Sequence, residues 1–253
     1  MAPVNRGPTQ GGPGDAGFRT TQWDLVFAAG SAAEPAAAAA LDVLCATYWY
    51  PLYAYVRRRG FRAQEAEDLT QGFFAMLLED KQTFGRADPA RGRFRAYLLG
   101  ALRNFLGDEV DKARAIKRGG GRRVVPLDVA AAEGRLEIDA GPDARPAEWH
   151  FDREWALTVL RRALDALGAE CADEGKGELF EALRPHLLAD GGETPRHAEL
   201  AAALGVTEGG LKVSLSRLRR RYGEYIRQEI AQTLGRSVAV EDEVQHLFEV
   251  LRG

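Results

Sequence analysis

Hydrophobic positions recur at helical spacing along most of this chain. Apolar residues three or four positions apart predict helices over residues 35–59, 63–79 and 93–117. In the second of these, Leu69, Phe73, Met76 and Leu77 form one apolar stripe. Few segments alternate as a half-buried strand does. The fold class is therefore predicted to be all-α.

Helical spacing resumes at residue 154 and continues through 177–188 into a helix, a turn and a helix that end near residue 226. Three residues are expected to interrupt the helices. Gly60 should end the first helix, Pro51 should bend or break it, and Gly168 should stop or weaken the helix that begins at residue 154.

Changes of composition divide the chain. The first twenty residues are rich in Gly and Pro without apolar positions, which is typical of a disordered tail. Residues 119–150 mix Gly, Pro and both charges without a helical period, which indicates a linker with a short extended piece at RVVPLDV. The sequence thus predicts two small helical domains joined by a linker. The expected segments are a tail at 1–20, a domain at 21–118, the linker at 119–150, a domain at 151–234 and a C-terminal extension at 235–253.

The composition fits a globular protein, with 253 residues, 45% hydrophobic residues and a net charge of −3. No apolar run is long enough to cross a membrane and no signal peptide is evident, so a cytoplasmic protein is expected. Cys45 and Cys171 are far apart and read as structural thiols in a reducing compartment. The four histidines are scattered, so no metal site is expected.

One strongly basic stretch, residues 205–227, stands out in this acidic chain. It follows a short apolar helix, and Gly205 suits a tight turn between two helices. Thr207 is a plausible N-cap for the second helix. Leu211, Leu215 and later apolar residues on the same face would dock the second helix on the first. This pattern is typical of a helix-turn-helix.

The side chains off that apolar face would point outward. Arg and Lys can contact guanine edges or phosphates in a DNA major groove, Ser can contact either, and Val can meet a thymine methyl. The alternative is a solvated basic face on an ordinary bundle helix. The preceding helix and turn favour DNA binding. The residues predicted to contact DNA here are Thr207, Lys212, Val213, Ser214, Ser216, Arg217 and Arg220.

Two polar faces are expected in the first half of the chain. Asp68 and Gln71 lie off the apolar stripe of the helix at 63–79. On the helix at 93–117, Arg93, Tyr97 and Asn104 share a face opposite its apolar side. An aromatic ring, an amide and nearby arginines suit unstacked single-stranded bases. The alternative is that Tyr97 is simply half-buried and Asn104 has no special role.

With these motifs in order, the chain resembles a bacterial sigma factor of the extracytoplasmic-function (ECF) type, in the sigma-70 family. AEDLTQGFFAMLLE and FRAYLLGALRNFLGDEV are similar to region 2, and AELAAALGVTEGGLKVSLSRLRRRY is similar to region 4. The resemblance covers about two thirds of the chain. It implies binding to core RNA polymerase through the β′ and β subunits and recognition of promoter DNA. An anti-sigma factor is a further partner that the resemblance leaves open.

The resemblance also implies roles for single residues. Asp68 and Gln71 match the motif whose helix grips the coiled coil of the β′ subunit. The loop at 84–93, which begins at Phe84, matches the loop that holds a base flipped from the −10 element. Arg93, Tyr97, Arg103 and Asn104 would meet the melted −10 strand, and the helix-turn-helix would meet the −35 element.

The sequence departs from the family pattern at three places. Gly72 stands where an acid usually follows the glutamine, which removes a charge and lowers helix propensity by about 1 kcal/mol relative to Ala. Tyr97 stands where Trp is more frequent. In region 4, Gly209 and Gly210 precede Leu211 in place of the usual G-T-V, so the −35 readout is expected to differ.

The competing interpretations are a DNA-binding regulator that acts without polymerase and an enzyme that acts on nucleic acid. The first leaves the Asp68/Gln71 and Tyr97/Asn104 faces without a purpose. For the second, the sequence holds no P-loop, metal triad or convincing Ser/His/Asp order. The chain is therefore expected not to be an enzyme and to need no cofactor or small-molecule substrate.

The extension at 235–253 has an apolar side and an acidic side. Two interpretations are open. It is either a helix that completes the bundle of the second domain, which we favour, or a regulatory flap that packs on that domain or mimics DNA.

Overall fold

The computed structural model describes residues 34–79, 93–115, 145–188, 197–234 and 239–253. Within these ranges the chain forms helices and one isolated bridge between Arg93 and Leu234, so the predicted all-α class is confirmed there. The tail at 1–20, Phe84 and most of the expected linker lie outside the described residues. The helices are α2 (Glu34–Arg58), α3 (Ala63–Glu79), α5 (Phe94–Ala115), α7 (Ala147–Asp173), α8 (Gly177–Leu188), α9 (His197–Ala203), α10 (Glu208–Thr233) and α11 (Val240–Arg252).

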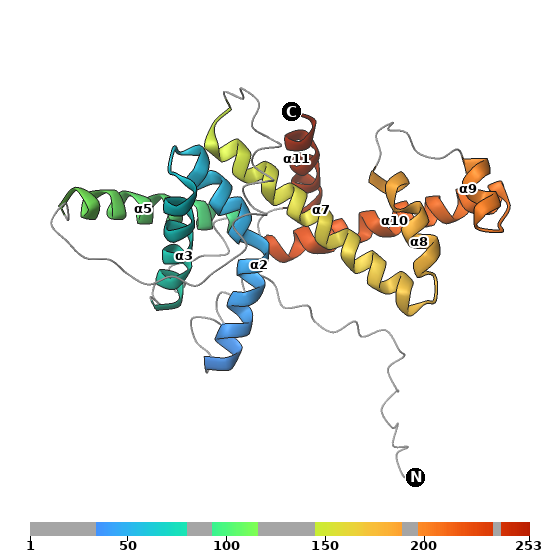
Figure 1. Cartoon of the computed structure of the whole chain (residues 1–253), viewed down its shortest axis with the longest axis horizontal. Helices are drawn as coiled ribbons and strands as arrows, with labels where there is room; N and C mark the ends of the chain where they lie inside the picture. Colours follow the sequence, from blue (N-terminus) through green and yellow to red (C-terminus); the bar gives the residue numbers. More distant parts are fainter. Residues whose placement is uncertain (1–33, 80–92, 116–144, 189–196, 235–238) are drawn as a thin grey trace, which may run out of the picture.

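Helix α7 lies at the centre of the fold. It packs on α2 along one side and on α10, α11 and α8 along others. Figure 1 shows α3 and α5 at one end of the molecule and α8 and α9 at the other, with α7 and α10 between them. Trp155 and Phe151 of α7 are fully buried, as are Tyr48 and Tyr53 of α2.

One hydrophobic cluster includes residues of α2, α3, α5, α7, α10 and α11. A second, smaller cluster joins α8, α9 and α10. The described parts of the segments at 21–118 and 151–234 therefore share a core. Their division into two domains stays a prediction.

Two expected helix breaks, at Pro51 and Gly168, are absent. Helix α2 continues through Pro51, whose neighbours Leu52 and Tyr53 are fully buried. Burial of these large side chains offsets the hydrogen bond that proline removes. Helix α7 likewise continues through Gly168, and it begins at Ala147, within the expected linker.

Gly168 is a packing residue. A Cβ atom at this position would lie 2.8 Å from Cε1 of Phe180 in α8. The glycine therefore lets α8 approach α7 closely, which is a tertiary requirement rather than a helix-ending signal. Gly60, by contrast, has a φ of 94° and lies two residues after the last residue of α2, so its predicted role as a helix terminator is confirmed.

The C-terminal extension contains α11, which packs on α7 and α10. Leu247 and Glu243 of this helix are fully buried and Val250 is nearly so, whereas Phe248 is exposed. This packing agrees with the interpretation of α11 as part of the bundle. No described helix is both long enough and apolar enough to cross a membrane.

Candidate nucleic-acid interface

The expected helix-turn-helix is formed by α9 and α10. After α9 the chain turns at Gly205, whose φ is 64°, and the N–H groups of Gly205 and Val206 donate to the carbonyls of Ala202 and Ala201. These two bonds form a Schellman motif, which favours glycine because of the left-handed backbone. The predicted role of Gly205 in the turn is confirmed.

The second helix begins as the sequence predicts. Thr207 is the N-cap of α10, and its Oγ1 accepts a hydrogen bond from the Gly210 N–H at 3.1 Å. Leu211 and Leu215 are buried against Ala201 of α9 and Leu183 of α8. This docking orients the opposite side of α10 toward solvent.

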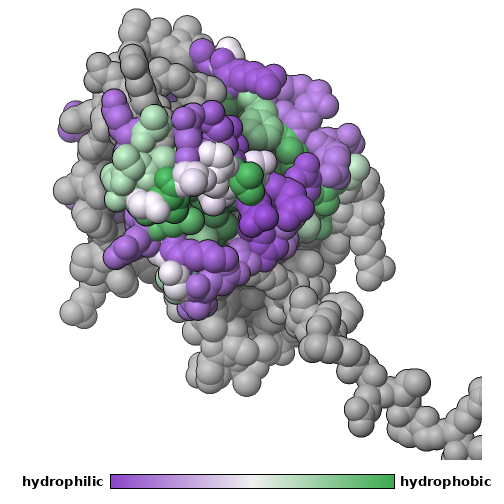
Figure 2. Space-filling model, turned by 90° about the vertical axis from the view of Figure 1, so that its right-hand side faces the viewer, coloured by the Kyte–Doolittle hydropathy of each residue, from purple (hydrophilic) through white to green (hydrophobic). Residues whose placement is uncertain are grey.

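The outward side of α10 carries most of the residues predicted to contact DNA. Thr207, Lys212, Val213, Ser216, Arg217 and Arg220 are exposed, and Ser214 is half-buried. Lys212 pairs with Glu208 at 2.6 Å, and Arg220 lies 3.9 Å from Glu224. Such exposed pairs contribute at most about 1 kcal/mol, so a phosphate can replace the carboxylate at little cost. Figure 2 views this end of the molecule and shows apolar residues gathered among hydrophilic ones.

Three arginines of the basic stretch are instead bonded within the protein, and two of them, Arg219 and Arg221, join α10 to other helices. Arg219 donates to the His186 carbonyl at 3.0 Å. Arg221 makes a bidentate contact with Glu170 of α7 at 2.5–3.0 Å, and Arg227 donates to the backbone at Gly223. Hydrogen bonding between them raises the pKa of Arg221 and lowers the pKa of Glu170. Fewer arginines are therefore available to contact DNA than the sequence suggests.

The residues predicted to grip polymerase lie on α3. Asp68 is exposed and Gln71 is half-buried, with its Nε2 donating to Oε1 of Glu67 at 3.0 Å. A Cβ atom at Gly72 would lie 3.3 Å from Cζ of Phe105 in α5. Gly72 thus lies where α3 and α5 pack closely together. The sequence alone does not show this packing.

The described residues predicted to contact the −10 strand lie in or beside α5, but they differ in accessibility. Asn104 is exposed, and Tyr97 is half-buried against the core. Arg103 is exposed, with its Nε donating to the Tyr55 hydroxyl at 3.2 Å. The fourth residue, Arg93, pairs with the buried carboxylate of Glu243 in α11 at 2.5 Å.

A network of buried charges surrounds that contact, and sequence reasoning missed it. Arg95 is nearly buried, lies over the Trp155 ring at 4.3 Å, and pairs with Asp152 at 2.9 Å and with Glu243. His246 of α11 lies 3.6 Å from the second oxygen of Asp152. Burial lowers the pKa values of Arg95 and His246. No local pattern relates these residues, because α5, α7 and α11 are distant in sequence.

A scan against protein-family models and searches of curated proteins and solved structures found no match to the chain. Among the described residues, no group of His, Cys, Asp and Glu could hold a metal ion. Cys45 and Cys171 form no disulfide, and burial raises the pKa of the Cys171 thiol.

Proposed function

We propose that the protein is a sigma factor of the ECF type, which binds core RNA polymerase and directs it to promoters. The observation that carries this proposal is the α9–turn–α10 unit, with Lys212, Arg217 and Arg220 facing outward and Arg221 holding α10 on α7. Basic side chains on the second helix of such a unit suit the DNA major groove.

Two further features support the sigma interpretation over a lone DNA-binding unit. The exposed Asp68 on α3 and the exposed Asn104 on α5 are available to a partner. Figure 1 also shows α5 and α9 at opposite ends of the molecule, as would suit contacts with two separate promoter elements. The chain then acts by binding at the −10 and −35 elements, and the polymerase performs the chemistry.

Core polymerase binding is the decisive experiment. The purified chain is mixed with bacterial core RNA polymerase alongside an Asp68→Ala/Gln71→Ala variant. Retention of the wild type and loss of the variant are expected, because β′ would contact the α3 face. Retention of neither protein would reject the sigma proposal and favour a regulator that binds DNA without polymerase.

DNA binding through α10 is tested separately with matched arginine variants. Replacing Arg217 and Arg220 with Gln should remove two phosphate contacts and reduce the slope of log K against log salt by about 2. Arg221→Gln should instead lower stability and leave that slope unchanged, because Arg221 faces Glu170. Equal effects of the two variants on the salt slope would reject the outward face as the DNA surface.

A further inference from the structure

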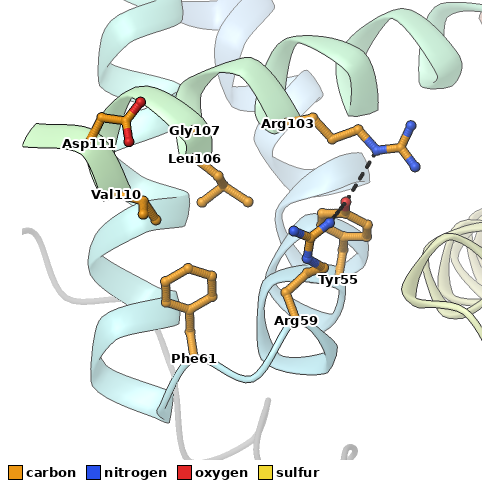
Figure 3. A pocket seen from close by; sticks show the side chains of 8 residues that line it. All are labelled: Tyr55, Arg59, Phe61, Arg103, Leu106, Gly107, Val110 and Asp111. Atoms are coloured by element: carbon orange, nitrogen blue, oxygen red, sulfur yellow. Dashed lines mark hydrogen bonds between the residues drawn. The ribbon is translucent and has the colours of Figure 1, made fainter. Parts of the chain in front are cut away.

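A pocket of about 380 Å³ lies between the end of α2, the turn that follows it, and α5. Figure 3 shows the ring of Phe61 facing Leu106 and Val110 of α5 across this space. These three side chains form apolar walls on opposite sides of the pocket. The pocket is separate from the helix-turn-helix and from the exposed face of Asp68.

One end of the pocket is cationic. Nε of Arg103 and NH1 of Arg59 both donate to the Tyr55 hydroxyl, at 3.2 and 3.3 Å. Figure 3 shows the two guanidinium groups on the same side of the pocket. Arg103 also pairs with Glu148 of α7. Two arginines against one carboxylate leave a net positive charge, which suits a phosphate group.

The opposite end is acidic, and Gly107 lies between the two ends. Arg103, Gly107 and Asp111 follow one another at four-residue intervals, so they share one side of α5 over about 12 Å of helix. Apart from the adjacent residues and the backbone of the same helix, no atom lies within 4 Å of the position that a Gly107 Cβ would occupy. Glycine inside a helix costs about 1 kcal/mol relative to alanine. Here it exposes the backbone where a ligand could approach.

From this arrangement we infer that the pocket binds one unstacked nucleotide. The phosphate contacts Arg59 and Arg103, the base lies between Phe61 and the apolar side chains of α5, and Asp111 accepts hydrogen bonds from the base edge. Guanine presents two adjacent N–H donors to a carboxylate, so the pocket should prefer guanine over thymine. The bound nucleotide is either part of a DNA strand or free. The first alternative rests on the proposed function, and the second does not.

Gly107→Ala is the principal test, because it separates binding from folding. The added methyl group occupies the space in which the nucleotide would approach the backbone, so binding of guanosine 5′-monophosphate, measured by calorimetry, should weaken at least tenfold. Alanine should meanwhile raise Tm by about 2–4 °C through its higher helix propensity. Gly100→Ala is the matched control, because Gly100 lies on the same helix with open space around it but does not line the pocket. It should raise Tm and leave binding unchanged.

Two more variants test the ends of the pocket. Arg59→Gln should reduce the preference for guanosine 5′-monophosphate over guanosine, because it removes a phosphate contact. Asp111→Asn should reduce the preference for guanosine 5′-monophosphate over thymidine 5′-monophosphate. Each variant thus changes one affinity ratio, whereas general damage to the fold would lower all affinities together.

The source of the nucleotide is identified with labelled TTGTT and TTTTT pentanucleotides. If TTGTT binds at least tenfold more tightly than the free nucleotide, and Gly107→Ala weakens both, a DNA strand is the source. If the free nucleotide binds as tightly as TTGTT, a free nucleotide is the source. Absence of saturable binding by any of these probes, or equal effects of Gly107→Ala and Gly100→Ala, would overturn the inference. Either result leaves the polymerase-binding experiment unaffected, so the two proposals fail separately.

Discussion

Replacing Glu243 with glutamine should lower the free energy of unfolding by about 3 kcal/mol. This carboxylate in α11 has no exposed side-chain surface and pairs with both Arg93 and Arg95 of the α5 region. The substitution keeps the size of the side chain but removes its charge. It therefore leaves the positive charges of two arginines, one of them nearly buried, with less negative charge beside them.

The magnitude follows from what remains around each arginine. Removing one partner of a buried ion pair costs about 3–5 kcal/mol. Arg95 keeps Asp152 at 2.9 Å and the face of Trp155, so we expect the lower end of that range. The side chain of Arg93 is 36% exposed and can be solvated by water. Arg93→Gln should therefore lower the free energy of unfolding by only about 1 kcal/mol, since Glu243 still pairs with Arg95.

Urea unfolding followed by circular dichroism measures these differences, provided that the slope m is the same in each variant. Glu241→Gln is the matched control, because Glu241 lies on the same helix, is 74% exposed and pairs with Arg227 at 3.3 Å. We expect its effect to be within about 0.5 kcal/mol. A loss below about 1 kcal/mol for Glu243→Gln, or one equal to the control, would refute the reasoning that α11 is held by a buried charge.

Three other changes test different parts of the fold. Gly168→Ala should destabilise by about 1 kcal/mol, because overpacking against Phe180 exceeds the gain in helix propensity, and combination with Phe180→Leu should restore stability in thermal unfolding. Burial lowers the pKa of His246, so the free energy of unfolding should be highest above about pH 6.5 and should fall as the pH drops through the lowered pKa of the folded state. His246→Gln should flatten this pH dependence in urea unfolding between pH 7 and 5. Gly205→Ala should cost about 1–2 kcal/mol because of its positive φ, whereas Gly209→Ala, within α10, should not destabilise in the same assay.

Local features of the sequence predicted the helices and the helix-turn-helix well. The spacing of Leu211 and Leu215 indicated the buried side of α10, Thr207 indicated its N-cap, and Gly205 indicated the preceding turn. These features depend on contacts within a few residues. A periodic pattern or a capping residue therefore carries enough information to predict them.

The same local rules failed where distant contacts determine the structure. Pro51 and Gly168 look like helix breakers, yet neither ends its helix. Burial in the core accompanies the continuous helix at Pro51, and the close approach of Phe180 explains the glycine at position 168. Neither reason is visible in a window of neighbouring residues.

The accessibility of the charged residues was likewise decided only by the tertiary structure. Arg221 and Arg217 belong to one basic run, but Arg221 meets Glu170, 51 positions away, while Arg217 stays exposed. Arg93 lies on an expected DNA face but meets Glu243 of α11. The sequence by itself determined that these segments are helical, the N-cap at Thr207, the turn at Gly205 and the sign of the charge on each face. Which charges remain open to a partner was set by packing, because an ion pair forms only where folding brings distant side chains together.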